Sequence, residues 1–190
     1  ENHAAPVVAL QVWIRIGSAD ERDEEAGMCH FIEHMIFKGT EKRKVREMAR
    51  EIESLGGFMN AYTSYDQTVY HVTLASRYGG VGLEILADAI QHSTFDAAEL
   101  EKEREVILEE IRMGEDEPGR RIFKQTMGTI FKKHPYRRPI IGYESTIGRI
   151  TRDQMVRFFR RWYVPNRMVF VAVGDFDRFD MERKVKEVFQ

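Results

Sequence analysis

Three polar side chains stand out on a helical stretch that is otherwise apolar. Residues 26–37 are nearly all apolar, and their polar side chains are His30, Glu33 and His34. A helix that is apolar on all sides is normally buried, and buried polar groups are costly without partners. At 100° per residue the three side chains fall within an arc of about 100°, one turn apart. Something must therefore satisfy all three together.

A bound metal ion satisfies such a set. Two histidines at positions i and i+4 direct their imidazoles at one point and can ligate Zn²⁺. A carboxylate beside them can take a proton from a zinc-bound water. The order His-x-x-Glu-His is the inverted form of the commoner zinc motif His-Glu-x-x-His. The alternative is a buried cluster of hydrogen-bonded side chains, and the glutamate at the required position favours the metal.

A third protein ligand is needed, because catalytic zinc sites usually have three and a water. The apolar stripe of the predicted helix 97–113 includes Leu100 and Ile107, and it is interrupted by Glu103 and Glu110, which lie on one face. The same helix carries other glutamates, so periodicity alone does not separate a ligand from a solvated charge. Three other histidines, His71, His92 and His134, are better explained as structural or exposed residues than as zinc ligands.

Composition excludes several classes of protein. The chain has 190 residues, 43% of them hydrophobic and 32% charged, with a net charge of -2. This balance, without a basic run interleaved with aromatics, argues against a nucleic-acid partner. No apolar stretch approaches the roughly 18 residues of a membrane span, so we expect a soluble protein. The single cysteine, Cys29, excludes an intramolecular disulfide and leaves the compartment open. We expect the charged stretches on solvated faces: 20–25, 137–138 and 160–161.

The order of predicted elements indicates the fold class. Alternating apolar residues predict a strand over 7–16, and the continuous apolar run Met168–Val173 suits a buried strand. The other expected elements are strands at Phe58–Thr63 and Thr68–Ala75 and helices at 26–37, 45–55, 81–93, 97–113 and 119–132. A further helix is expected after a capping box of Thr151 and Gln154, with an apolar stripe that ends at Trp162, and a last helix follows the final strand. This order predicts an α+β fold, a two-layer sandwich in which helices pack on one face of a mixed, mostly antiparallel sheet.

Residues 27–40 read GMCHFIEHMIFKGT, which closely resembles the signature of the pitrilysin, insulysin and mitochondrial processing peptidase family. The resemblance covers nearly the whole chain and is closest to the processing-peptidase branch. It continues through four further segments: 56–71, 101–111, 134–142 and 169–176. In this family the third zinc ligand is a glutamate about 75 residues after the motif, and residues 35–109, which number 75, separate His34 from Glu110. The resemblance thus selects Glu110 over Glu109.

The resemblance implies a zinc-dependent endopeptidase with one Zn²⁺ per domain. His30, His34 and Glu110 would bind the metal, and Glu33 would act as general base. Glu103, seven residues before Glu110, matches a family carboxylate that supports the site without ligating zinc.

The resemblance also implies how a peptide substrate binds. In the family, the strand with an Asn-Ala pair lies at a sheet edge beside the zinc; here that strand is Phe58–Thr63, with Asn60 and Ala61. An extended peptide would add to it as a further strand. Taken without the family, Asn60 is better explained as a strand-end residue. Phe37 follows the motif and either walls the site or belongs to the core.

The resemblance implies that residues 1–190 are a single domain, the N-terminal catalytic half of a two-half peptidase. The first strand and the C-terminal half are expected outside this sequence, and the isolated half is expected to cleave peptides poorly. The second half would belong to the same chain or to a partner subunit, and a homodimer is a further expected arrangement. The bacterial cytoplasm is the favoured compartment, ahead of the mitochondrial matrix and the periplasm. The alternative function is a non-catalytic scaffold or regulatory subunit, but such members lose motif residues that are intact here.

Overall fold

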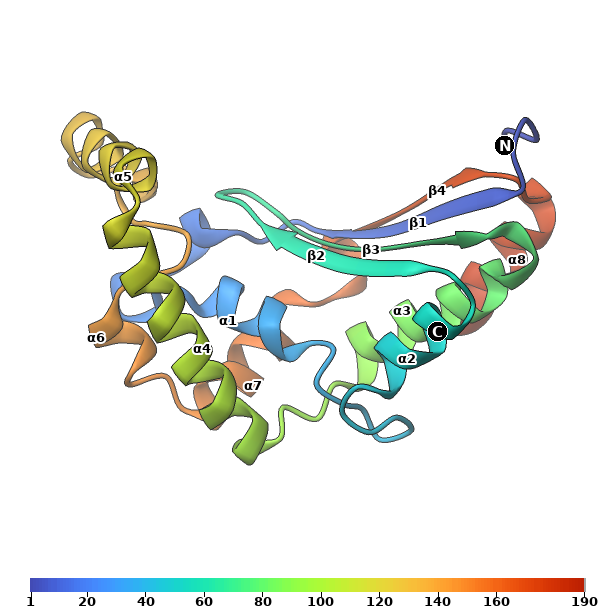
Figure 1. Ribbon diagram of the computed structural model, residues 1–190, viewed down its shortest axis with the longest axis horizontal. Coiled ribbons are helices and arrows are strands. Elements are labelled where there is room, and N and C mark those ends of the chain that lie inside the picture. Colours follow the sequence, from blue (N-terminus) through green and yellow to red (C-terminus); the bar gives the residue numbers. More distant parts are fainter. Residues whose placement is uncertain (190) are drawn as a thin grey trace.

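The structure, a computed structural model, describes residues 1–189. A curved four-stranded sheet forms one layer, and the helices pack against one of its faces (Figure 1). The strands are β1 (Val7–Ile14), β2 (Phe58–Thr63), β3 (Thr68–Ala75) and β4 (Met168–Gly174). The helices are α1 (Met28–Met35), α2 (Glu47–Ser54), α3 (Gly79–His92), α4 (Ala97–Asp116), α5 (Pro118–Ile130), α6 (Glu144–Ile147), α7 (Arg152–Trp162) and α8 (Arg178–Val188).

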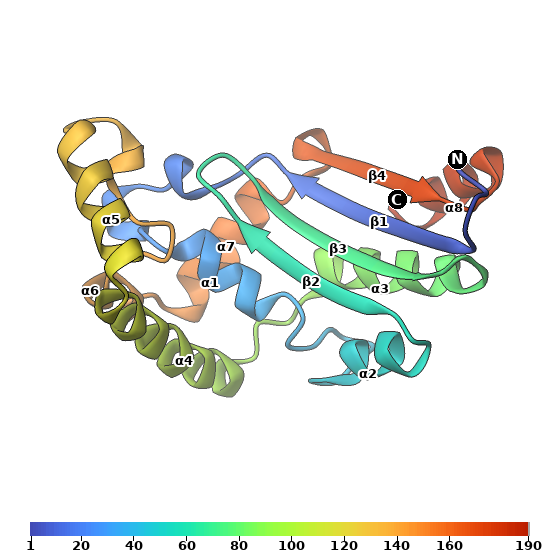
Figure 2. The same ribbon diagram turned by 45° about the horizontal axis from the view of Figure 1, so that its top comes forward.

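The sheet has the order β2-β3-β1-β4, so β2 and β4 form its edges (Figure 2). All three pairings between these strands are antiparallel, and Val12 in the centre of β1 faces Tyr70 on one side and Phe170 on the other. This arrangement confirms the predicted α+β fold with helices on one face. Among the described helices, none is both long and apolar enough to cross a lipid bilayer.

The core lies between the sheet and the helices α1 and α3. On β1 the side chains of Leu10, Val12 and Ile14 point inward and are fully buried, and they alternate with half-buried residues. Helix α3 packs closely on the strands: a Cβ added at Gly82 would come within 2.7 Å of the Val72 side chain. Helix α1 packs against β2 on this same face of the sheet.

The last strand differs from its prediction as a buried strand. β4 is an edge strand, and Val169 and Val173 on its outer face are 50% and 59% exposed. A continuous apolar run is typical of a strand that is covered on both faces. Here helices cover one face only, so the run marks an edge whose outer face is apolar and uncovered in residues 1–189.

Two charged residues that were expected on solvated faces are buried. Glu21 is 4% exposed and Arg138 is 5% exposed. The Glu21 carboxylate accepts hydrogen bonds from two backbone N–H groups at the start of α1, at 2.9 and 2.7 Å. Burial raises the pKa of Glu21 to about 8, although these N–H donors act in the opposite direction. The Arg138 guanidinium donates to backbone carbonyls of the 18–21 loop, so both residues anchor the N-terminus of α1.

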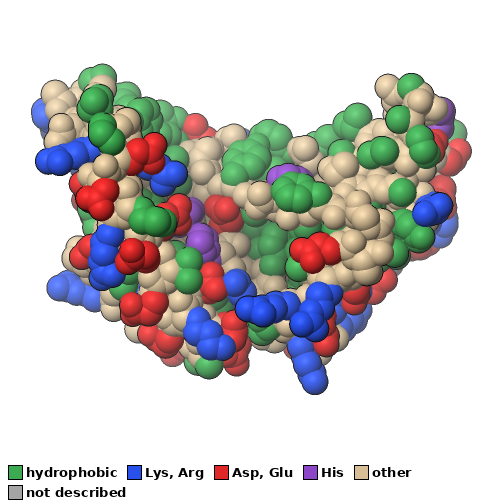
Figure 3. Space-filling model, in the orientation of Figure 1, with side chains coloured by type: hydrophobic (Ala, Val, Ile, Leu, Met, Phe, Trp, Pro, Cys, Tyr) green, Lys and Arg blue, Asp and Glu red, His purple; other side chains and the backbone are tan. Residues whose placement is uncertain are grey.

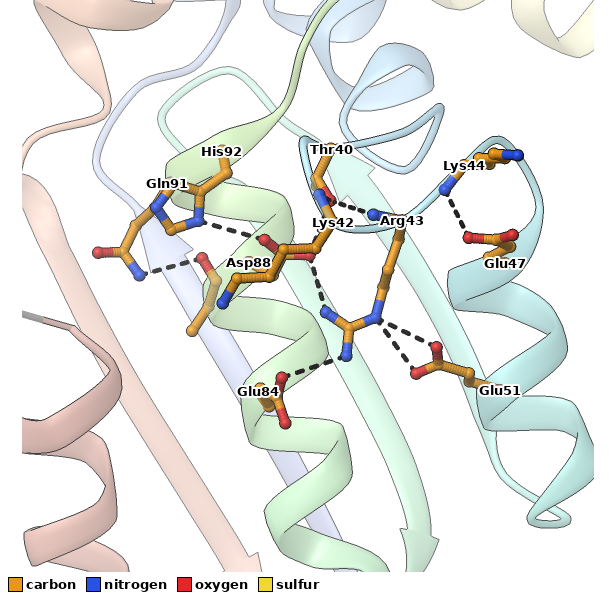
Figure 4. Close-up of polar contacts among 11 residues, drawn as sticks. Thr40, Lys42, Arg43, Lys44, Glu47, Glu51, Glu84, Asp88, Gln91 and His92 are labelled. Atoms are coloured by element: carbon orange, nitrogen blue, oxygen red, sulfur yellow. Dashed lines mark hydrogen bonds and ion pairs between the residues drawn. The ribbon is translucent and has the colours of Figure 1, made fainter.

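A buried carboxylate fixes the loop that follows α1. Asp88 on α3 is 3% exposed and accepts hydrogen bonds from the Thr40 hydroxyl and the Arg43 guanidinium, each at 2.8 Å (Figure 4). Arg43 also pairs with Glu51 on α2 at 3.2 Å. The two contacts hold the loop against α3 and α2, and thereby fix the C-terminal end of α1.

We expect Asp88→Ala to lower the free energy of unfolding by about 3 kcal/mol, because the Thr40 hydroxyl and the Arg43 guanidinium both lose a hydrogen bond to a buried, charged acceptor. Urea unfolding of the variant measures this loss. Asp180→Ala is the matched control, since Asp180 lies on α8 and its ion pairs are exposed. Equal unfolding midpoints for the two variants would show that the loop is not held by Asp88.

Candidate metal centre

Helix α1 carries three of the candidate residues on one face. The opposite face is buried in the core and consists of apolar side chains: Phe31, Ile32 and Met35. His30, Glu33 and His34 are half-buried, so they remain accessible to a ligand. Gly27 precedes the helix with a φ of 93°, and a Cβ there would approach the carbonyl oxygen of Ile141 to 2.6 Å. The chain can therefore enter α1 at this angle only with glycine.

The structure brings a potential ligand atom from each of His30, His34 and Glu110 to within 4.8 Å of one another. Helix α4 packs across α1, and Oε2 of Glu110 lies 3.8 Å from Nε2 of both histidines. Glu109, the preceding residue, points away: its side chain is 62% exposed and pairs with Arg112. Two imidazole nitrogens and one carboxylate oxygen match the protein ligands of a catalytic zinc site.

The protonation state of His30 also suits a metal ligand. Burial, followed by the neighbouring His34, lowers the pKa of His30 to about 3. The imidazole is therefore neutral at pH 7, as metal ligation requires. Its contact with Glu110 is then not an ion pair, and 3.8 Å is too long for a hydrogen bond. Nδ1 of His30 is buried without a hydrogen-bond partner in the described part of the chain. Nε2 of His30 is left to bind a cation together with His34 and Glu110, so the residues present fit a zinc ion.

Glu103 lies next to His34, on the side away from Glu110. Its carboxylate lies 3.2 Å from Nδ1 of His34 and accepts a hydrogen bond from the Lys38 ammonium at 2.5 Å. A carboxylate at Nδ1 orients the ring and leaves Nε2 for a metal. Lys38 was missed by the sequence reasoning, although its position four residues after His34 placed it near the same side of the helix.

Glu33 lies beside the potential ligands. Its carboxylate accepts a hydrogen bond from the Thr63 hydroxyl on β2 at 2.6 Å. Burial raises the pKa of Glu33, whereas Thr63 and His34 act in the opposite direction. A raised pKa brings a carboxylate closer to the range of an effective general base. Thr63 was also missed in the sequence; the available signal was its position on β2, two residues after Ala61 and on the same face of the strand.

A cleft of about 520 Å³ opens beside the metal-binding side chains. His30, Thr63 and Glu110 line one side of it, and the segment 137–142 and Phe123 of α5 line the other. The surface is hollowed between the end of the molecule that carries α5 and the opposite end (Figure 3).

The three residues expected to contact substrate differ in their exposure and packing. Asn60 and Ala61 are on the edge strand β2, where Asn60 is exposed and its side chain accepts a hydrogen bond from the backbone N–H of Ala61. Phe37 is half-buried, and its ring meets that of Tyr70 edge to face at 5.8 Å. Phe37 is thus packed against the core, whereas Asn60 and Ala61 lie along the open edge.

Two protein-family models match consecutive parts of the chain. Residues 1–144 match the family model of insulinase, peptidase family M16, and residues 149–190 match the model called the peptidase M16 inactive domain. The candidate site residues, from His30 to Glu110, all lie within the first match. The part that matches the inactive domain therefore contains none of them.

Two curated relatives illustrate the sequence similarity. The chain is 37% identical over 188 residues to a probable mitochondrial-processing peptidase subunit beta of Arabidopsis thaliana, covering 99% of this chain and 35% of the relative. It is 38% identical to the uncharacterized zinc protease YmxG of Bacillus subtilis, covering 88% of this chain and 41% of the relative. The chain thus spans well under half the length of these relatives.

Solved structures share the fold. A protease from Helicobacter pylori superposes with a TM-score of 0.95 at 27% identity, covering 99% of this chain and 46% of that one. The periplasmic protease PqqL from Escherichia coli gives a TM-score of 0.89 at 34% identity, covering 98% of this chain and 22% of that one. With the matched family model, these likenesses show that the chain belongs to the insulinase family of peptidases, family M16.

Proposed function

We propose that this chain is the catalytic domain of a zinc endopeptidase that hydrolyses extended peptides. The observation that carries the proposal is the convergence of His30, His34 and Glu110 from two helices, with Glu33 beside them. Relatives that are named zinc proteases support the choice of metal.

The residues of the site then have separate roles. His30, His34 and Glu110 would hold one Zn²⁺, which would polarise the scissile carbonyl and make the attacking water more acidic. Glu33 takes a proton from that water and passes it to the leaving amine. Glu103 fixes the ring of His34 and keeps its Nδ1 engaged.

The peptide would bind along the open edge of the sheet. Backbone groups of Asn60 and Ala61 on β2 would pair with an extended substrate, which adds as a fifth strand. Main-chain pairing of this kind supplies affinity with little side-chain selectivity. Phe37 would support the neighbouring strand β3 from the core side rather than contact the scissile bond, since it packs against Tyr70 of that strand.

The whole enzyme would be larger than this chain. The chain spans 35% and 41% of the two curated relatives, which supports a single domain that pairs with a second homologous half in the same chain or in a partner subunit. A homodimer is the further arrangement we propose. Relatives are named as mitochondrial and periplasmic proteins, so these compartments stand beside the bacterial cytoplasm as proposed locations.

Removal of the metal tests the proposed function. We expect dialysis of the full-length protein, with its second half present, against dipicolinate to abolish peptide hydrolysis, and stoichiometric Zn²⁺ to restore it. Dialysis without the chelator is the control. Hydrolysis at the native rate after complete removal of zinc would contradict a zinc-dependent mechanism.

A further inference from the structure

Thr63 occupies the point where the sheet edge meets the candidate site. It is the last residue of β2 and pairs with Thr68 across the hairpin. It is half-buried, and it lines the same cleft as His30 and Glu110. Thr63 therefore belongs both to the edge strand β2 and to the wall of the candidate site.

The hydroxyl of Thr63 is directed at one partner. It donates to Oε2 of Glu33 at 2.6 Å, a short distance that is typical of an O–H donor on a carboxylate. The turn that follows β2 is stabilised by Ser64 instead, whose hydroxyl donates to the carbonyl of Gln67 and accepts from the backbone N–H of Asp66. The Thr63 hydroxyl is therefore not needed to form the turn.

The carboxylate of Glu33 needs such a contact to adopt one orientation. The terminal torsion of a glutamate side chain has a broad, roughly two-fold distribution, so an unsupported carboxylate samples many orientations. A proton acceptor, by contrast, must lie within hydrogen-bond reach of the proton that it abstracts. The hydrogen bond from the Thr63 hydroxyl to Oε2 restricts the rotation of the carboxylate and does not engage Oε1, which can accept the proton of the attacking water.

We propose that Thr63 is a positioning residue, whose hydroxyl holds the Glu33 carboxylate in the orientation for proton transfer and so couples the substrate-binding edge strand to the general base. The inference rests on the proposed function, in which Glu33 is the base and β2 receives the peptide. Because the donor belongs to β2 itself, a peptide that pairs with this strand meets a base that is already aligned with it.

A set of variants of the full-length, zinc-loaded protein tests the hydroxyl separately from the rest of the side chain. Thr63→Ser keeps the hydroxyl, Thr63→Ala removes the hydroxyl together with the γ-methyl group, and Thr63→Val removes only the hydroxyl and keeps the shape of threonine on a strand. Thr73→Val is the matched control, since Thr73 is a half-buried threonine at the far end of β3. For each variant kcat, KM, zinc affinity and melting temperature are measured.

We expect Thr63→Ala and Thr63→Val to lower kcat by about 10- to 100-fold, the usual cost of losing a residue that orients a catalytic group. KM and zinc affinity should stay within about twofold of the native values, since neither the ligands nor the backbone of β2 is altered. Thr63→Ser should recover most of kcat, and Thr73→Val should match the native protein.

Equal kcat for Thr63→Ser and Thr63→Ala would overturn the inference, as would a rise in KM at native kcat, which would place Thr63 in substrate binding. Glu33→Gln, measured in parallel, separates this failure from failure of the proposed function. If Glu33→Gln is inactive while Thr63→Ala is native, only the positioning role is wrong. If Glu33→Gln itself retains native hydrolysis, the proposed general base is wrong as well.

Discussion

Glu33→Gln is expected to lower kcat for peptide hydrolysis by roughly 100- to 10,000-fold, the range that a positioned general base contributes. Glutamine has nearly the same shape as glutamate and can still accept the hydrogen bond from Thr63, but it cannot take a proton from water. The half-buried position of Glu33 and the raised pKa of its carboxyl agree with a group that exchanges protons. Zinc content should be unchanged, because Glu33 is not one of the converging ligands.

The measurement is steady-state hydrolysis of a peptide by the full-length protein, together with its zinc content. Glu105→Gln is the matched control, since Glu105 is an exposed residue of α4. If Glu33→Gln bound zinc and cleaved peptides at the native rate, another group would have to serve as base. If it lost zinc, Glu33 would have to be a ligand.

Glu110→Gln is expected to weaken zinc binding by more than the 10- to 100-fold that loss of an outer partner typically costs, because it removes the charge of one of three protein ligands. Glu109→Gln should leave zinc affinity unchanged. The two residues are adjacent on α4, but the Glu110 carboxylate lies 3.8 Å from both histidines, whereas Glu109 is exposed and pairs with Arg112.

Competition with a chromophoric zinc chelator measures both affinities. The pair is informative because the two substitutions are chemically identical and differ only in the direction of the side chain. Equal weakening by both would mean that the helix charge as a whole, and not a ligand at Glu110, determines the affinity.

Local patterns predicted much of the fold. The expected strands Phe58–Thr63 and Thr68–Ala75 match β2 and β3, and α4 begins at the expected residue 97, after Asp96, whose side chain caps the helix. These features depend on alternation, turn residues and capping, which act over a few residues. The exposed β4 and the buried Arg138 were predicted wrongly, because each depends on which segments distant in sequence come to cover it.

The same distinction applies to the candidate site. The helical spacing of His30, Glu33 and His34 was readable directly, because the three lie within five residues, 30–34. Glu110 could be selected only by resemblance, since α4 carries several glutamates and helical periodicity alone does not tell a metal ligand from a solvated side chain. Thr63 was missed, because its contact with Glu33 joins residues 30 positions apart and depends on how α1 packs beneath β2.

The zinc K-edge X-ray absorption spectrum of the zinc-loaded protein tests the central claim most directly. The site described here predicts one zinc per chain with two imidazole nitrogens at about 2.0–2.1 Å and oxygen ligands at about 2.0–2.2 Å. The imidazole signal should fall in His34→Ala. A sulfur ligand at about 2.3 Å, or a spectrum unchanged in His34→Ala, would contradict the assignment of His30, His34 and Glu110 as the metal ligands.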